Sequence, residues 1–271
     1  MPNIEATKEL ARRIREDALR MVHAANASHI GTGLSMADIL AVLYGGVLRV
    51  DPKRPAWSDR DRLVMSKGHG AAALYAALAN AGFFEVARLD TFCQDGTALA
   101  GHVSHHVPGV DFSTGSLGHG LSLACGVALG LKVDARAGRA FAILSDGECD
   151  EGSIWEAALF APHHKLDNLV AIVDYNKIQS FGSVKEVLDL EPFADKWAAF
   201  RWDVEVVDGH DHEALARVLE AAPKAGRPRA VIAHTVKGKG VEFMEGKLLW
   251  HYKAPDAEQL RAALDQVRGS S

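Results

Sequence analysis

The sequence has 271 residues, with 30 lysines and arginines against 35 aspartates and glutamates, and a formal net charge of −5. A chain of this length can bury a sizeable core, and we expect a single domain over residues 1–271. Because charges of both signs are mixed and no basic stripe occurs, the composition excludes nucleic acid as an expected partner.

The spacing of the cysteines and the length of the apolar runs indicate the cellular compartment and whether the protein contacts a membrane. Cys93, Cys125 and Cys149 are far apart and form no CxxC pattern, which favours a reducing compartment. The N-terminus is charged and lacks an apolar signal region, and no run reaches membrane-spanning length. We therefore expect a cytoplasmic protein without membrane contact.

The N-terminal third predicts helices joined by loops that contain histidine. Apolar residues at helical spacing indicate an amphipathic helix over 5–25, and Ser35 with Asp38 indicates a second helix to about residue 48. The loop between them carries His29, and a lone loop histidine is usually structural or exposed. A short strand over 63–65 ends in Ser-Lys-Gly-His-Gly, and an alanine-rich helix over 71–81 follows. His69 thus stands at a helix N-terminus, where backbone amides can bind phosphate.

Residues 93–120 show little periodicity and contain His102, His105, His106 and His119. A loop of this length inside a compact domain is uncommon and often functional. The histidines do not favour a zinc site, because no cysteine or paired carboxylate accompanies them at ligand spacing.

A strand–helix–strand unit follows, with apolar runs at 141–144 and 169–173 and a helical pattern from Ser153. The right-handed crossover makes these strands parallel, so Asp146 and Asn176 both fall at strand carboxyl ends, where open α/β sheets bind ligands. Their oxygens suit Mg²⁺, and Gly147 lets the backbone approach a phosphate. The alternative is an ordinary capped helix after a strand.

The last third predicts an irregular segment from 182 to 197, a strand over 204–207, a helix that Asp211 caps, and a buried strand over 228–236. The segment Lys237-Gly-Lys-Gly240 lacks the full phosphate-loop spacing. Alternating strands and helices predict an α/β fold, a mainly parallel sheet covered by helices on both faces.

Asp146-Gly147, Glu151-Gly152, Trp155-Glu156-Ala157 and Asn176 together resemble the thiamin diphosphate motif, in the variant found in the N-terminal half of transketolases. The resemblance covers residues 5–262 and implies the thiamin diphosphate-binding fold, as its diphosphate-binding domain. It implies that Asp146, Asn176 and the Ile178 carbonyl hold Mg²⁺, for which Ca²⁺ or Mn²⁺ can substitute. It also places Gly147 and Glu148 at the thiamin diphosphate.

The same resemblance gives roles to the histidines and to one loop. His29, in Ala-Ser-His-Ile-Gly where the family has Ser-Gly-His-Pro-Gly, and His102, followed by Val103 instead of proline, would contact substrate. His69 would approach the cofactor and the reacting centre. The remaining implied cofactor contacts are Gly115, Ser116 and Leu117, on the aminopyrimidine side, and His251, near the diphosphate.

The family chemistry moves a two-carbon ketol unit from a ketose to an aldose. The ketose expected here is phosphorylated or otherwise anionic. Only the diphosphate-binding half is present, so the resemblance implies a separate C-terminal subunit with the pyrimidine-binding domain, in an α2β2 assembly. The alternatives are a subunit similar to deoxyxylulose phosphate synthase, one similar to a 2-oxo acid dehydrogenase, and a non-catalytic scaffold.

Overall fold

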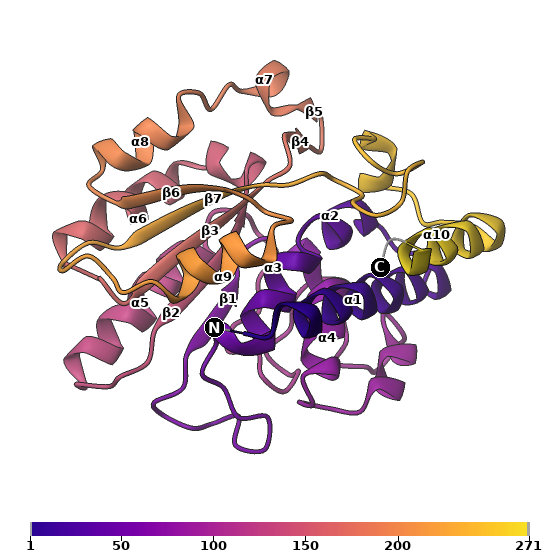
Figure 1. Cartoon of the computed structure of the whole chain (residues 1–271), viewed down its shortest axis with the longest axis horizontal. Helices are drawn as coiled ribbons and strands as arrows, with labels where there is room; N and C mark the ends of the chain where they lie inside the picture. Colours follow the sequence, from indigo (N-terminus) through magenta and orange to yellow (C-terminus); the bar gives the residue numbers. More distant parts are fainter. Residues whose placement is uncertain (1, 270–271) are drawn as a thin grey trace.

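The computed structural model describes residues 2–269 and is built around one parallel sheet (Figure 1). Its five strands follow the order β1-β2-β3-β7-β6, and every neighbouring pair is parallel. All residues of β2 and β3 are buried, as expected for central strands covered on both faces. The strands are β1 (Arg62–Met65), β2 (Ala140–Ser145), β3 (Leu169–Tyr175), β6 (Asp203–Asp208) and β7 (Arg229–His234).

Helices cover both faces of the sheet, so the α/β prediction is confirmed. Side chains alternate along β2: Phe141 and Ile143 belong to one apolar core, whereas Ala142 and Leu144 belong to the other. The first core is shared with α1 (Ile4–Ala24), α2 (Ile30–Ser35), α3 (Ala37–Val42), α4 (Ala71–Asn80), α9 (His212–Glu220) and α10 (Ala257–Gly269). The second is shared with α5 (Gly120–Val133), α6 (Gly152–His163) and α8 (Phe193–Ala199).

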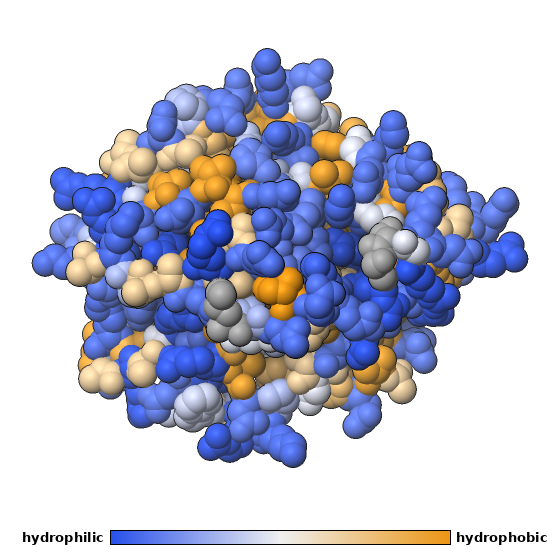
Figure 2. All heavy atoms as spheres, viewed as in Figure 1, coloured by the Kyte–Doolittle hydropathy of each residue, from blue (hydrophilic) through white to orange (hydrophobic). Residues whose placement is uncertain are grey.

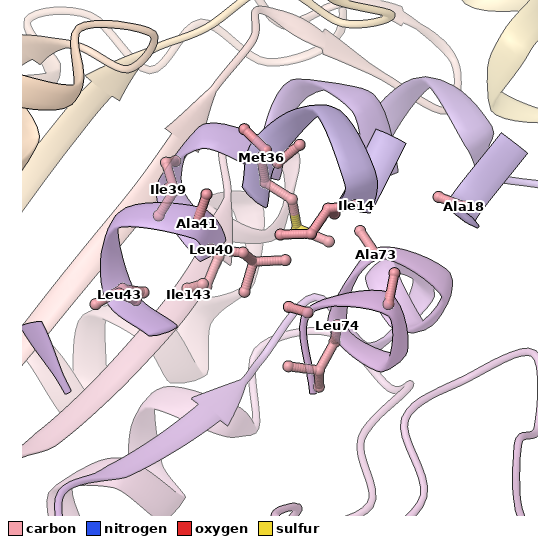
Figure 3. Packing of buried hydrophobic residues seen from close by; sticks show 14 of the residues in the cluster. Ile14, Ala18, Met36, Ile39, Leu40, Ala41, Leu43, Ala73, Leu74 and Ile143 are labelled. Atoms are coloured by element: carbon pink, nitrogen blue, oxygen red, sulfur yellow. The ribbon is translucent and has the colours of Figure 1, made fainter. Parts of the chain in front are cut away.

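The first core fixes the elements that carry the N-terminal loops. Figure 3 shows Met36, Ile14 and Ala73 gathered where α1, α4 and the α2–α3 region meet, with Leu40 directed toward the same centre. Leu40 is fully buried, and burial of one such side chain contributes about 1.5–3 kcal/mol. In Figure 1, α10 lies beside α1, so the first and last helices of the described chain pack against each other.

The predicted helix from Ser35 to about residue 48 is wrong in its start and its continuity. The helical segment begins at Ile30 and is interrupted at Met36, and α3 passes into a π-helical turn over Leu43–Val47. Ser35 does not cap a helix, because its hydroxyl lies 2.6 Å from Asp174 Oδ2. A tertiary contact has therefore replaced the local capping interaction that the sequence suggested.

The segment expected to be irregular, 182–197, contains more structure than predicted. After the short antiparallel pair β4 (Ile178–Gln179) and β5 (Gly182–Ser183), it forms α7 (Val184–Val187) and most of α8. Phe193 and Trp197 of α8 are buried in the second core. These aromatic side chains stabilise a short helix that periodicity alone did not reveal.

The segment 92–119 contains neither an α-helix nor a β-strand, as predicted, yet it is held against the sheet edge. The Tyr75 hydroxyl on α4 donates to the His102 carbonyl at 2.9 Å and accepts from the Ser104 amide at 3.0 Å. The Thr114 hydroxyl donates to the Met65 carbonyl at 2.6 Å. These bonds bring this loop to the carboxyl end of β1.

Within residues 2–269, none of the helices has the length and apolar character needed to cross a membrane.

Candidate active site

The carboxyl ends of β1, β2 and β3 open onto a cavity of about 220 Å³. Most of the predicted site residues line it, although they come from widely separated segments. They are His29, His69, His102, Gly115, Leu117, Asp146, Gly147, Asn176, Ile178 and His251.

Asp146 and Asn176 face this cavity from the loops after β2 and β3. The two Asp146 oxygens accept backbone N–H bonds from Gly147 at 2.8 Å and Lys177 at 2.5 Å. The Asn176 amide oxygen accepts from the Ile178 amide at 3.1 Å. Both turns thus present side-chain and carbonyl oxygens to one space.

The donor set fits a hard divalent cation, for which oxygen ligands are preferred. Burial, and next the charge of Asp174, raise the pKa of Asp146 to about 6. A cation beside this carboxylate would offset that cost and favour its ionised form. Within residues 2–269, no group of three or more His, Cys, Asp or Glu side chains is arranged so that it could hold a metal ion by itself.

Lys237 is a site residue that the sequence interpretation missed. Its Nζ donates to the Ile178 carbonyl at 2.9 Å and lies 3.0 Å from His251 Nδ1. Burial and the charge of Lys67 lower the pKa of Lys237 to about 8. The available signal is the basic, glycine-rich segment directly after the last strand, although that segment lacks the full phosphate-loop spacing.

A buried charge pair lies at the base of the site. Lys67 Nζ contacts Asp174, and both side chains are fully buried. Asp174 also receives the hydroxyls of Ser35 and Thr235, so it ties together β1, α2 and the end of β7. The sequence offers no signal for this pair, because its members are far apart and each reads as an ordinary loop or strand residue.

Four histidines cluster over the cavity. The His29 ring centroid lies 5.2 Å from that of His69, 5.7 Å from His102 and 5.0 Å from His251. Burial is the main cause that lowers the pKa of His29 to about 4, of His251 to about 3, and of His69 well below its usual value. These three imidazoles are therefore neutral near pH 7 and can both donate and accept hydrogen bonds.

The hydrogen bond from Lys237 assigns a tautomer to His251. An ammonium group can only donate, so His251 Nδ1 accepts and its proton is on Nε2. His29 is fixed by its backbone, since its amide donates to the His251 carbonyl at 2.9 Å. On the other side of His29, His69 and His102 lies a second cavity of about 200 Å³, which Ser28 and Phe92 also line.

Two of the predicted cofactor contacts do not line the cavity. Ser116 is exposed, and Glu148 is fully buried beneath the adjoining loop. Glu148 Oε1 accepts from the Gly118 amide at 2.9 Å and Oε2 from the Ser145 amide at 3.2 Å. In this structure Glu148 joins the loop after Gly115 to the end of β2.

One glycine is required by the close approach of two segments at the site. A Cβ on Gly68 would lie 2.3 Å from the Thr114 carbonyl oxygen. The absence of a side chain lets the loop that carries Gly115 pass directly beside His69.

Comparisons with known proteins agree with this geometry. The family model described as "Transketolase, thiamine diphosphate binding domain" matches residues 6–267. The chain is 44% identical to the 6-deoxy-6-sulfo-D-fructose transketolase subunit SqwG of Clostridium sp., over 94% of this chain and 93% of that protein. It is 41% identical to one of the subunits of the apulose-4-phosphate transketolase of Phocaeicola vulgatus, over 97% of this chain and 94% of that protein.

Full-length transketolases are matched over less than half of their length. The Homo sapiens transketolase is 38% identical over 92% of this chain, which spans 40% of that protein. The crystal structure of the Campylobacter jejuni transketolase superposes with a TM-score of 0.92 at 34% identity, over 98% of this chain and 43% of that one. The thiamin diphosphate-binding fold is thereby confirmed. This chain belongs to the transketolase family, as a subunit that corresponds to its N-terminal, thiamine diphosphate-binding domain.

Proposed function

We propose that this subunit binds thiamin diphosphate through Mg²⁺ and, with a separate partner subunit, transfers a two-carbon ketol unit from an anionic ketose to an aldose. The observation that carries the proposal is one cavity in which oxygen donors, a buried ammonium group and four histidines converge. The oxygen donors suit the metal, the ammonium group suits a diphosphate, and the histidines suit a polyhydroxylated substrate.

The metal site would be formed by Asp146, Asn176 and the Ile178 carbonyl, with Mg²⁺ as the expected ion and Ca²⁺ or Mn²⁺ as substitutes. Lys237 provides positive charge toward an anionic diphosphate, and Gly147 lets the backbone come close to it. When bound, thiamin diphosphate supplies a nucleophilic carbon and an electron sink. The protein supplies binding, orientation and control of protons.

The histidines divide into two groups in this proposal. His29 and His102 would contact substrate hydroxyls, the role that the resemblance to transketolases implies; like His69, both border the first cavity and the second cavity beyond the cluster. His69 would lie closer to the cofactor. Since His29 and His69 are neutral near pH 7, they can accept a hydroxyl proton or donate an N–H as the substrate requires.

The substrate would be a ketose with a charged group at the end remote from the ketol unit. The related subunits are named for a sulfonated ketose and for a ketose phosphate. Both sugars carry an anionic group, so we propose that class of substrate for this chain.

The partner would be a C-terminal transketolase subunit with the pyrimidine-binding domain. This chain spans nearly all of two related transketolase subunits but only about 40% of full-length transketolases. We propose an α2β2 assembly in the cytoplasm, where the three free cysteines would stay reduced.

The test is reconstitution. The purified chain is confirmed to be folded, and ketol transfer is assayed with thiamin diphosphate and Mg²⁺ before and after the product of a neighbouring transketolase-like reading frame is added. The donors are fructose 6-phosphate, 6-deoxy-6-sulfofructose, apulose 4-phosphate and unphosphorylated xylulose. Turnover only with the partner, and preference for a charged donor, are expected.

Two outcomes would contradict the proposal. Full turnover by the chain alone would reject the requirement for a partner. The absence of calorimetric thiamin diphosphate binding by the reconstituted pair would instead identify a non-catalytic scaffold.

A further inference from the structure

A cluster of charged and titratable groups lies outside the cavity, around the buried Asp38 on α3. Arg15 of α1 donates to both Asp38 oxygens, from Nη1 at 2.9 Å and from Nη2 at 2.6 Å. His210 Nδ1 lies 2.6 Å from Asp38 Oδ2, and His212 Nε2 lies 3.1 Å from Oδ1. The bidentate arginine compensates the buried carboxylate, so Asp38 is a fixed anchor for the histidines.

The second nitrogen of His210 has a different partner. His210 Nε2 lies 2.9 Å from the backbone nitrogen of Val236. A backbone N–H can only donate, so Nε2 must accept, and the ring proton must be on Nδ1, where it faces Asp38. The side chains of His210 and Asp38 are 14% and 7% exposed, so water competes little for the bond between them, whereas the bond from the Val236 amide lies at the surface.

Val236 lies two residues beyond the end of β7. The β6–β7 ladder ends with Asp208 opposite His234, so the Val236 amide has no strand partner. His210 directly follows β6 and Gly209, and its own amide donates to Asp208 Oδ1 at 2.8 Å. His210, in the loop after β6, thus supplies a side-chain acceptor for the first unpaired amide beyond the β6–β7 ladder.

The Val236 amide, which donates to His210, stands directly before the residue that reaches the active-site cavity. Val236 immediately precedes Lys237, the ammonium group that contacts the Ile178 carbonyl and His251. On the far side of Lys237, the Gly238 amide donates to the Gly31 carbonyl at 2.9 Å. The amides on both sides of Lys237 thus have acceptors, and the Lys237 carbonyl itself accepts from the Gly246 amide at 2.9 Å. Of these hydrogen bonds, the one from the preceding amide depends on His210.

We propose that His210 is a positioning residue: oriented by Asp38, it accepts the Val236 N–H and so fixes Lys237 for the anionic group that binds in the cavity. The inference deepens the proposed function and rests on it for the cofactor readout. The hydrogen bond to Val236 itself is testable without any ligand.

His212 offers a matched control. It donates to the same carboxylate, but its Nδ1 contacts the Thr7 hydroxyl of α1 at 2.8 Å and so leads away from the cavity. If the cluster served only stability, variants of His210 and His212 would have the same effects. If His210 positions Lys237, only its variants will change binding in the cavity.

The experiment compares His210→Ala, His210→Gln and His212→Gln, each in the reconstituted enzyme and as the ligand-free chain. The readouts are hydrogen exchange of the Val236 amide in the ligand-free chain and the calorimetric Kd for thiamin diphosphate at fixed Mg²⁺. Glutamine presents an amide oxygen that can accept the Val236 N–H, and an NH₂ group that can donate to Asp38. It therefore serves as the conservative variant.

His210→Ala is expected to lose Val236 protection and to weaken thiamin diphosphate binding about three- to tenfold, the range of one lost hydrogen bond. His210→Gln should retain both properties, and His212→Gln should change neither. The proposal would be overturned if His210→Gln weakened thiamin diphosphate binding as much as His210→Ala does. It would also be overturned if His212→Gln weakened that binding to the same extent.

Unchanged Val236 exchange in His210→Ala would also overturn it. If the wild-type pair binds no thiamin diphosphate, the proposed function fails, and the exchange measurement alone then decides whether His210 holds Val236.

Discussion

Asp146 is a carboxylate whose surroundings favour a bound cation. Its pKa in the fold, about 6, lies above the ordinary 3.8 because of burial and Asp174. The metal requires the ionised form, so protons and Mg²⁺ compete for the same oxygens. As pH falls through about 6, the carboxylate becomes protonated and Mg²⁺ affinity must decrease.

We therefore expect the Mg²⁺-dependent affinity for thiamin diphosphate to be greatest between about pH 7 and 8 and to fall by up to about tenfold per unit below pH 6. It should also fall above about pH 8, where Lys237 loses its proton. Calorimetry of the reconstituted pair at pH 5.0, 6.0 and 7.5 measures this. Asp146→Asn should weaken binding at pH 7.5 and abolish the pH dependence. Asp150→Asn, a neighbouring carboxylate outside the cavity, is the control, and an equal loss in that variant would refute the assignment.

His29 and His102 test the division of roles among the histidines. If they contact substrate, His29→Ala and His102→Ala should lower kcat/KM about 10²- to 10⁴-fold and leave the Kd for thiamin diphosphate unchanged. The exposed His119, in the neighbouring loop, provides the control His119→Ala, which should behave as wild type. A parallel loss of cofactor affinity would instead assign these histidines to the cofactor.

At the scale of elements, the Lys67–Asp174 pair connects β1, β3, α2 and the end of β7. Removal of one member leaves the other charge buried without compensation. Lys67→Met should therefore lower the free energy of unfolding by about 3–5 kcal/mol.

Urea denaturation measures this change. The double variant Lys67→Met/Asp174→Asn should recover part of the loss, because it removes the uncompensated charge. The control Lys8→Met breaks only an exposed pair with Glu5 and should leave the urea midpoint unchanged. A double variant no more stable than Lys67→Met would contradict this account.

The elements that the sequence predicted well are those whose signal is local. Apolar runs marked all strands of the parallel sheet, and strand ends located Asp146 and Asn176. The interruption at Met36 was missed because Ser35 contacts Asp174, which is distant in the chain. Lys237 and the buried position of Glu148 were missed for the same reason, since tertiary packing decides where these side chains point.

At the scale of the whole molecule, the two faces of the sheet present different surfaces. The face that carries α1 and α9 is mostly hydrophilic, with scattered apolar patches (Figure 2). The opposite face carries α5 and α6, where Val133, Leu159 and Phe160 are 76%, 62% and 38% exposed. On α5, a Cβ at Gly126 or Gly130 would meet nothing within 4 Å, so another backbone could approach closely there.

A subunit that needs another chain must bury some surface against it, and exposed apolar groups are the usual markers of such a surface. We expect Leu159→Glu to weaken assembly at least about tenfold, because burial of a leucine contributes about 1.5–3 kcal/mol and a carboxylate there would also lose its hydration. The mass of the reconstituted complex by light scattering, across a dilution series, measures the change. Val206→Glu is the matched control, since Val206 is 52% exposed but lies on β6. Equal loss of assembly in both variants would indicate general destabilisation, whereas an unchanged mass in Leu159→Glu would place the partner on another face.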